Sequence, residues 1–430
     1  MIQKIINPDK SNWIQLCKRP TLPRLDVNGL VNDVFNEIKA DGDAAVKKYT
    51  ALFDDVNIEI LKVSNDQVEA AAQQVSGDLK KAIQLAKDNI EKFHTMQREE
   101  KQVVETMPGI ACWRESRPIE RIGIYIPGGS APLFSTVLML GIPAAIAGCK
   151  EVVLCSPPDK NGIINPAILY AAQLVGITSI YAIGGIQAIG AMAIGTESIA
   201  KVNKIFGPGN QYVTAAKQAA LGCGVAIDLP AGPSEVLVIA DASCTPEFVA
   251  ADLLSQAEHG ADSQVMLLTN DEAVADAVMA AVVRQTALLQ RKEIVNKCLN
   301  NSKVVVLPSI KDCIALSNLY APEHLILAID EADEWIERVE SAGSVFMGNY
   351  SCESAGDYAS GTNHTLPTNG YASSYSGVSL DSFVKKITFQ NISPSGLQNI
   401  GPAIECMAAA EQLEAHKNAV TIRLKYLQNV

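Results

Sequence analysis

The sequence predicts an α/β protein with two doubly wound units in tandem, a helical N-terminal region and a small helical C-terminal segment. Short apolar runs alternate with helical patterns from Ile122 onward, and this alternation starts again at Glu235. Such alternation is typical of parallel strands that are buried in a sheet and covered by helices. The length of 430 residues supports two units, because one hydrophobic core rarely serves so long a chain.

The region before residue 105 is expected to be helical. Apolar residues recur at helical spacing over residues 31–53 and again over residues 66–98. Residues 1–22 lack this pattern, and we expect them to form an N-terminal arm. We expect the helical region, residues 23–105, to pack with residues 235–378 as one α/β domain.

Each unit contains five expected strands, and helical patterns lie between them. In the first unit, within an α/β domain of residues 106–234, the apolar runs cover residues 122–127, 151–156, 179–185, 202–209 and 225–232. In the second unit they cover residues 235–241, 263–270, 303–309, 324–330 and 344–349. Residues 350–378 are rich in Gly, Ser, Tyr and Asn and are expected to form a long functional loop. Residues 379–430 form a separate C-terminal segment, helical from about Gly396.

Composition excludes several classes of protein. A hydrophobic content of 48% with 19% charged residues indicates a well-buried soluble protein, and the net charge of −12 argues against a nucleic-acid partner. The longest apolar run, residues 137–149, is shorter than the ~20 residues of a membrane-spanning helix. Ten cysteines without a C-x-x-C pair indicate reduced thiols and a cytoplasmic protein.

Two histidine-containing pairs are expected to meet at one edge of the second sheet. Gln256 and His259 lie three residues apart at a helix end before Gly260, and Glu323 and His324 open the strand 324–330. A helix end and the start of a following parallel strand lie at the same edge. Ligands usually bind at the opposite, carboxyl edge, so we expect this unit to form one wall of an inter-domain cleft. The alternatives are a C-capping histidine and an exposed pair at a strand entry.

The adjacent Glu323 and His324 are candidate acid–base groups, because their ordinary pKa values differ and imidazole titrates near neutral pH. Gln256, His259, Asp357 and His416 together offer two imidazoles, a carboxylate and an amide oxygen. This donor set suits zinc or a similar divalent ion that keeps open positions for a substrate.

Three glycine-rich turns lie at strand or helix ends of the first unit, in YIPGGSAP, GGIQAIG and IFGPGNQYV. None is a complete G-x-G-x-x-G fingerprint. Their clustering at the carboxyl ends of strands leaves two interpretations open, namely ordinary tight turns and a cofactor site.

Several long motifs, in order along the chain from about residue 120, carry a resemblance to a known family. They are RIGIYIPGGSAP, KIFGPGNQYVTAAK, DLPAGPSEVLVIAD, DLLSQAEHGADSQV, APEHL, SAGDYASGTNHTLPT and LEAHKNAVTIR. With them the chain resembles the histidinol dehydrogenases. The resemblance implies incomplete Rossmann-like units, an NAD-dependent enzyme with one zinc ion per subunit, and oxidation of L-histidinol through L-histidinaldehyde to L-histidine at the end of histidine biosynthesis.

The resemblance also implies residue roles. Glu323 and His324 would be catalytic, and Tyr125, Gln187 and Asn210, one in each glycine-rich turn of the NAD-binding domain 106–234, would contact NAD. The zinc ligands would be Gln256, His259, Asp357 and His416, the last from the partner of a homodimer formed through residues 379–430. Substrate contacts would include these ligands and the catalytic pair, together with Ser234, His364 and Glu411.

The sequence leaves three other functions to compare with this one. A zinc hydrolase could activate water with a metal and the Glu323–His324 pair and would need no cofactor. A thiohemiacetal route would use a cysteine such as Cys112 or Cys149, but neither has an evident base beside it. A non-catalytic metal-binding module would not need two glycine-rich α/β units.

Overall fold

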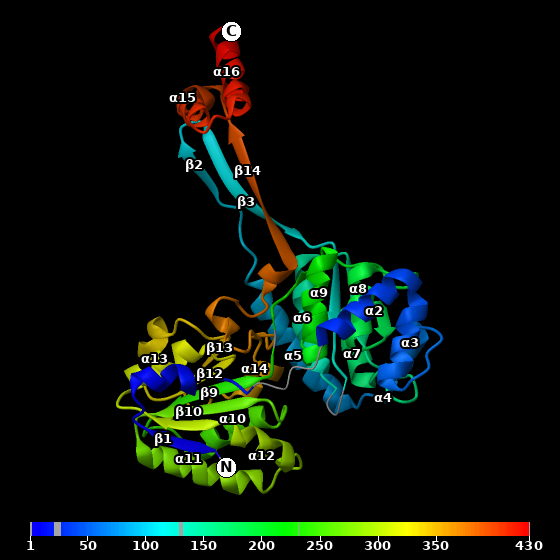
Figure 1. The fold of residues 1–430 in the computed structure, drawn as a ribbon, viewed down its shortest axis with the longest axis vertical. Coiled ribbons are helices and arrows are strands. Elements are labelled where there is room, and N and C mark those ends of the chain that lie inside the picture. Colours follow the sequence, from blue (N-terminus) through cyan, green and yellow to red (C-terminus); the bar gives the residue numbers. More distant parts are fainter. Residues whose placement is uncertain (1, 21–26, 129–131, 231, 430) are drawn as a thin grey trace. The chain divides into compact units, whose positions relative to one another are not determined.

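The computed structural model describes residues 2–20, 27–128, 132–230 and 232–429 (Figure 1). The chain divides into two compact units. The first comprises Met1–Gln97 and Ile119–Phe383, and the second comprises Arg98–Pro118 and Val384–Val430. Both units are therefore built from segments that lie far apart in the sequence.

The first sheet of the first unit is parallel and doubly wound, as expected. Its strand order is β6-β5-β4-β7-β8, so the chain starts in the middle of the sheet and builds outward in both directions. The strands are β4 (Arg121–Tyr125), β5 (Glu151–Ser156), β6 (Ser179–Ala182), β7 (Lys204–Phe206) and β8 (Ala226–Ile227). The helices between them are α6 (Phe134–Ala147), α7 (Pro166–Leu174), α8 (Gly185–Ile194) and α9 (Gln211–Ala220).

The second sheet repeats this topology and adds one strand. Its order is β1-β11-β10-β9-β12-β13, and all pairs are parallel. The strands are β9 (Glu235–Ala240), β10 (Gln264–Thr269), β11 (Lys303–Val306), β12 (His324–Ala328) and β13 (Ser344–Met347). Its helices are α10 (Pro246–Ala257), α11 (Glu272–Thr286), α12 (Lys292–Asn300), α13 (Ile310–Tyr320) and α14 (Glu353–Tyr358). All ten expected strands are confirmed, and so is the tandem arrangement.

The N-terminal segment differs from the expected arm. Strand β1 (Gln3–Ile6) pairs with β11 and forms one edge of the second sheet. Helix α1 (Trp13–Leu16) follows, and the side chains of Trp13 and Leu16 are buried in the core under β9 and β12. Residues 21–26 lie outside the described residues. The prediction of an arm is therefore wrong for residues 3–16.

The helical region packs on the first sheet, which corrects a second expectation. Its helices are α2 (Val27–Asp41), α3 (Asp43–Asp54), α4 (Asn65–Gln74) and α5 (Gly77–Thr95). Ile38 of α2 shares a core with Ile189 of α8, and Ile90 of α5 shares another with Ile124 of β4. The predicted packing of residues 23–105 with residues 235–378 is wrong, because helical periodicity shows which face of a helix is apolar but not which sheet covers it.

The second unit contains a three-stranded antiparallel sheet and two helices. The sheet has the order β14-β3-β2, with β2 (Val103–Met107), β3 (Ile110–Pro118) and β14 (Val384–Ile392). Helices α15 (Pro394–Ala410) and α16 (Glu414–Gln428) confirm the helical C-terminal segment. Residues 106–118 belong to this unit and not, as expected, to the NAD-binding domain, because β3 pairs with β14 along its whole length.

Short helices complete the structure. These 3-10 helices cover Lys10–Asn12, Leu221–Cys223, Ala332–Arg338, Tyr371–Ser373 and Leu380–Phe383. Among the described residues, no helix is both long enough and apolar enough to cross a bilayer.

A buried ion pair fixes the turn after β7. Lys217 Nζ of α9 lies 2.5 Å from Asp228 Oδ1, and their side chains are 4% and 1% exposed. Lys217 also donates to the carbonyl oxygen of Gly207 (2.8 Å), whose N–H donates to Asp228 Oδ2 (2.9 Å). Gly207 has φ +124°, and a Cβ there would run into the carbonyl oxygen of Tyr125. The turn therefore requires glycine, and the ion pair holds both sides of it.

Lys217→Met is expected to destabilise the protein by about 3–5 kcal/mol, because it leaves the buried Asp228 carboxylate without its cation. Denaturant unfolding measures the loss. The matched control is Lys150→Met, since Lys150 forms an exposed pair with Glu120 and should contribute little. Equal stability of the two variants would show that the buried pair does not hold this turn.

Candidate functional site

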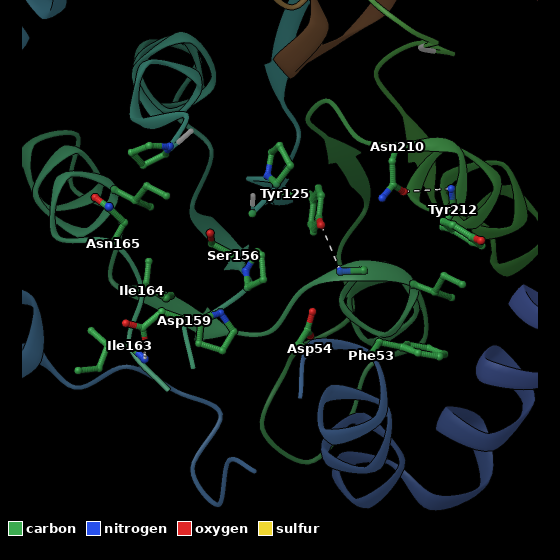
Figure 2. A pocket seen from close by; sticks show the side chains of 18 of the residues that line it. Phe53, Asp54, Tyr125, Ser156, Asp159, Ile163, Ile164, Asn165, Asn210 and Tyr212 are labelled. Atoms are coloured by element: carbon green, nitrogen blue, oxygen red, sulfur yellow. Dashed lines mark hydrogen bonds between the residues drawn. The ribbon is translucent and has the colours of Figure 1, made fainter. Parts of the chain in front are cut away.

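A cavity of about 1040 Å³ opens at the carboxyl edge of the first sheet (Figure 2). Tyr125 at the end of β4, Ser156 at the end of β5, Gly185 of α8 and Asn210 before α9 all line it. Phe53 and Asp54 at the end of α3 also line the cavity. The volume and the position suit a cofactor, because open α/β sheets bind ligands beyond the carboxyl ends of their strands.

The three residues expected to contact NAD gather at this edge. Tyr125 accepts a hydrogen bond at its hydroxyl from the N–H of Gly185 (3.1 Å), and burial raises the pKa of its phenol to about 12. Asn210 caps α9 and accepts from the N–H groups of Tyr212 (3.1 Å) and Val213 (3.2 Å). Tyr125 and Asn210 line the cavity directly.

Gln187 lies behind the cavity wall. It is fully buried on α8, and its Nε2 donates to Asp54 Oδ2 (3.0 Å), while Asp54 itself lines the cavity. Within the described residues its Oε1 has no hydrogen-bond partner. An unpaired buried acceptor beside a cavity with helix N-termini around it fits a polar ligand such as a dinucleotide.

A second cluster lies at the amino edge of the second sheet. The backbone N–H of Glu235, the first residue of β9, donates to Glu323 Oε2 (2.8 Å). Nδ1 of His324, the first residue of β12, donates to the carbonyl oxygen of Glu235 (3.1 Å). All three residues are buried. The strand register thus places the Glu323–His324 pair directly beside the start of β9.

Gln256 joins this cluster from the end of α10, as the edge argument predicted. The end of its side chain lies 3.4 Å from Glu323 Oε2. Its amide is satisfied when the nitrogen donates to Glu353 and the oxygen accepts from the N–H of Glu235 (2.9 Å). Gln256 is 1% exposed, so it is a buried contact between the acid–base pair and the carboxylates beside it.

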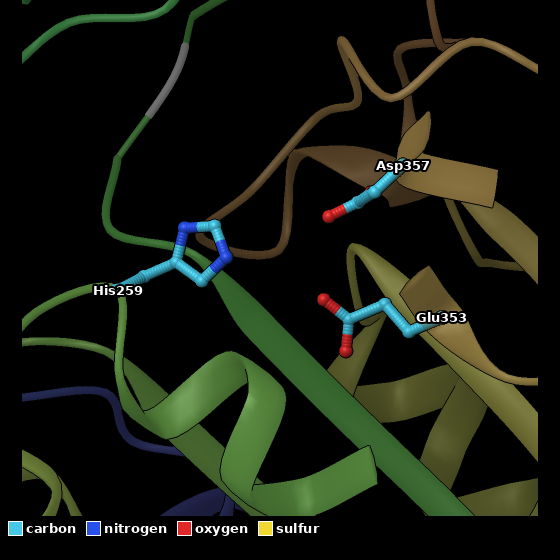
Figure 3. A group of neighbouring side chains, drawn as sticks. All are labelled: His259, Glu353 and Asp357. Carbon is cyan, nitrogen blue, oxygen red and sulfur yellow. The ribbon is translucent and has the colours of Figure 1, made fainter. Parts of the chain in front are cut away.

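His259, Glu353 and Asp357 form a candidate metal site beside this cluster (Figure 3). One potential ligand atom from each lies within 4.8 Å of the other two. Glu353 was not predicted from the sequence. Its spacing of four residues from Asp357 in ESAGDY would have been a signal, because that spacing places both carboxylates on one face of α14.

His364 connects the two edges. Its Nδ1 donates to the carbonyl oxygen of Asp357 (2.8 Å), and its Nε2 lies 3.0 Å from the hydroxyl of Thr136 in the first turn of α6. The neighbouring Asn363 donates to the carbonyl oxygen of Met139 in the same helix (2.6 Å). The amino edge of the second sheet is therefore joined to the helix that follows β4 of the first sheet, and the cleft expected between the two sheets stays a prediction.

The cluster carries an excess of acidic groups. Burial raises the pKa of Glu323 to about 8 and that of Glu353 to about 8. Burial opposes the charge on His324, but the carboxylates of Glu323, Glu353 and Asp357 raise its pKa to about 10. Its Nε2 lies 3.5 Å from Asp357 Oδ1 and, within the described residues, makes no hydrogen bond. Such a buried excess of carboxylates, with a free ring nitrogen beside it, favours a cation.

The remaining predicted site residues are Ser234, Glu411 and His416. Ser234 immediately precedes β9 and is half-buried. Glu411 and His416 are exposed, at the end of α15 and on α16 of the second unit.

The cysteine route finds no support. Burial raises the pKa of the Cys149 thiol to about 11, whereas a nucleophilic cysteine needs a lowered pKa. Cys112 lies in β3 of the second unit.

Paired doubly wound sheets, a carboxyl-edge cavity and a buried acid–base cluster are typical of oxidoreductases that use a dinucleotide. The family model for histidinol dehydrogenase matches residues 17–424. Histidinol dehydrogenase of Bacteroides thetaiotaomicron is 58% identical over 428 residues and covers 100% of each chain, and that of Bacteroides fragilis is 57% identical over 421 residues with 98% of each covered. The crystal structure of histidinol dehydrogenase from Elizabethkingia anophelis superposes with a TM-score of 0.98 at 62% identity over 99% of each chain.

The chain belongs to the histidinol dehydrogenase family. It is therefore an NAD-dependent oxidoreductase, an L-histidinol dehydrogenase of histidine biosynthesis.

Proposed function

We propose that the chain oxidises L-histidinol through L-histidinaldehyde to L-histidine, at the end of histidine biosynthesis in the cytoplasm, with zinc and two molecules of NAD per turnover. The observation that carries the proposal is one juxtaposition at the amino edge of the second sheet. There the Glu323–His324 pair lies beside the side-chain atoms of His259, Glu353 and Asp357 that could coordinate a metal ion.

The proposed zinc ligands are Gln256, His259 and Asp357, with His416 of the partner subunit. The donor chemistry fits, because imidazole, carboxylate and amide oxygen are all ligands of divalent ions. Glu353 would support the site from behind, since it accepts a hydrogen bond from Gln256. A zinc ion, when bound, supplies a Lewis-acid anchor for the neutral nitrogen donors of an amino alcohol.

The proposed NAD site is the carboxyl-edge cavity. Tyr125 and Asn210 would contact the cofactor, and Gln187 would fix the cavity wall through Asp54 or turn its unpaired oxygen to the ligand. NAD, when bound, accepts the hydride in each oxidation.

The acid–base work falls to Glu323 and His324. His324 takes the hydroxyl proton at Nε2, because its Nδ1 is committed to the carbonyl oxygen of Glu235. The surrounding carboxylates favour the protonated imidazole, and a bound divalent cation would offset their charge and favour the neutral form that accepts a proton. Glu323 takes a proton from the water that adds to the aldehyde carbon, and its pKa of about 8 suits proton exchange near neutral pH.

The proposed substrate site combines residues of two subunits. Ser234 and His364 would line it at the sheet edge, together with the zinc ligands and the catalytic pair, while Glu411 of the partner subunit would complete it. A homodimer would supply that residue. Helices α15 and α16 support this assembly, because Met407, Ile422 and Tyr426 are exposed apolar side chains on them.

Metal removal tests the zinc site. Chelation should abolish activity and added zinc should restore it. His259→Ala should also lose the bound zinc in a direct metal analysis, because it removes one proposed ligand. Asp333→Asn, at an exposed acidic position outside the cluster, is the control and should keep its zinc. Full activity in metal-free protein would exclude the proposed site.

The catalytic pair is tested with histidinol and histidinaldehyde as separate substrates. Glu323→Gln should slow the oxidation of the aldehyde by about 100-fold or more and slow that of the alcohol less, because only the second oxidation consumes water. His324→Asn should slow both, since it removes the base for the alcohol proton. Equal losses on both substrates in both variants would contradict the division of roles. Product without reduced nicotinamide would instead indicate the zinc hydrolase.

Complementation tests the shared site. A His416→Ala chain is mixed with a His324→Asn chain under conditions that exchange subunits, each variant having only a small residual activity alone. The mixed dimer should recover one intact site, and hence about half of the wild-type activity of a dimer, because each site takes His324 and His416 from different chains. A mixture that exchanges its subunits and stays inactive would show that each site comes from one chain.

A further inference from the structure

An arginine from the N-terminal segment reaches the amino edge of the second sheet. Arg19 Nε lies 2.5 Å from Glu235 Oε1, and its Nη2 lies 2.9 Å from Glu235 Oε2. The side chains of Arg19 and Glu235 are 15% and 3% exposed. Both carboxylate oxygens are thus held by one planar guanidinium, which fixes the orientation of Glu235 more strictly than a single contact would.

The same guanidinium holds a second backbone segment. Arg19 Nη2 donates to the carbonyl oxygen of Tyr320 (2.7 Å) and lies 3.4 Å from that of Ala321. Its central carbon lies 4.0 Å from the centre of the Tyr320 ring. Ala321 has φ +51°, a left-handed conformation that a residue with a Cβ adopts at some cost. Arg19 therefore stabilises the unusual turn that leads into β12.

These two segments carry the groups that hold the acid–base pair. The N–H of Glu235 donates to Glu323 (2.8 Å), and its carbonyl oxygen accepts from His324 Nδ1 (3.1 Å). Glu323 and His324 themselves follow Ala321 by two and three residues. A shift of either segment would move the carboxylate away from its donor or turn the imidazole.

We propose that Arg19 is a positioning residue for the reaction: it clamps the start of β9 to the turn before β12 and so fixes the Glu323–His324 pair. The inference rests on the proposed function of that pair. Burial of an ion pair contributes little to stability compared with apolar side chains of similar volume. A buried bidentate pair at this edge is therefore explained by geometry, because acid–base groups lose activity when they are displaced by about 1 Å.

The first test is Arg19→Lys in the zinc-loaded enzyme. Lysine keeps the charge but cannot hold both oxygens of Glu235 and the Tyr320 carbonyl together. We expect kcat to fall about 10- to 100-fold while KM for NAD stays within about twofold, because the NAD cavity lies at the edge of the other sheet. The control is Arg284→Lys, in an exposed pair with Glu247, which should leave both constants unchanged. An unchanged kcat in Arg19→Lys would overturn the inference.

The second test asks whether Arg19 acts through the pair. If it does, Arg19→Lys should reduce activity by less than about threefold when His324 is already Asn, since there is little left to position. The same fold-loss in both backgrounds would show a separate, structural role and overturn the inference. Full activity of His324→Asn alone would instead refute the proposed function, whatever Arg19 does.

A charge-free variant separates positioning from folding. Replacement of both partners, Arg19→Met with Glu235→Met, removes the buried charges together and leaves neither unpaired. We expect Tm to stay within a few degrees of wild type and kcat to fall as in Arg19→Lys. Wild-type kcat in this double variant would overturn the inference. This variant also decides the question if Arg19→Lys alone does not fold.

Discussion

When a strand is buried on both faces, only the residues at its two ends are accessible to a substrate or cofactor. Every residue of β9 and of β10 is buried, and no polar group can work from the middle of such a strand. The first sheet accordingly presents Tyr125 at a carboxyl end, and the second presents His324 at an amino end. The contact between His364 and Thr136 joins these opposite edges, so a reaction that needs a cofactor and an acid–base pair can use both sheets.

The fold was largely predictable from the sequence, because apolar runs and glycine-rich turns are local signals. All ten central strands lie where the pattern indicated. The errors concern which strands pair at the sheet edges and which sheet the N-terminal helices cover, and both have one cause. Strand β1 pairs with β11 and strand β3 pairs with β14, and helices α2–α5 cover the first sheet and not the second. These facts depend on partners roughly thirty to three hundred residues away, and a local pattern does not identify such a partner.

The candidate site was predicted in part from geometry and in larger part from resemblance. The edge argument alone brought Gln256 to Glu323, and the structure confirms that contact. It did not find Glu353. The four-residue spacing between Glu353 and Asp357 indicates a helix, but the segment has a composition typical of a loop. Arg19 gave no signal, because a single arginine before a proline resembles any surface residue. Gln187 shows a further limit: it lies at the predicted turn, but its side chain turns to Asp54 behind the wall.

The discontinuous course of the chain has a consequence for the order of assembly. Strand β1 can pair only after β11 has been synthesised. Arg19 can form its hydrogen bond only after Tyr320, which lies 301 positions later. During synthesis β1 and Arg19 leave the ribosome long before these partners exist, while α2–α5 and the first sheet can already associate. Closing so long a loop is slow, because its entropic cost is offset by favourable contacts only when both ends have formed. Arg19 is thus fixed late, and the acid–base pair reaches its final geometry only after the segment around Tyr320 has formed.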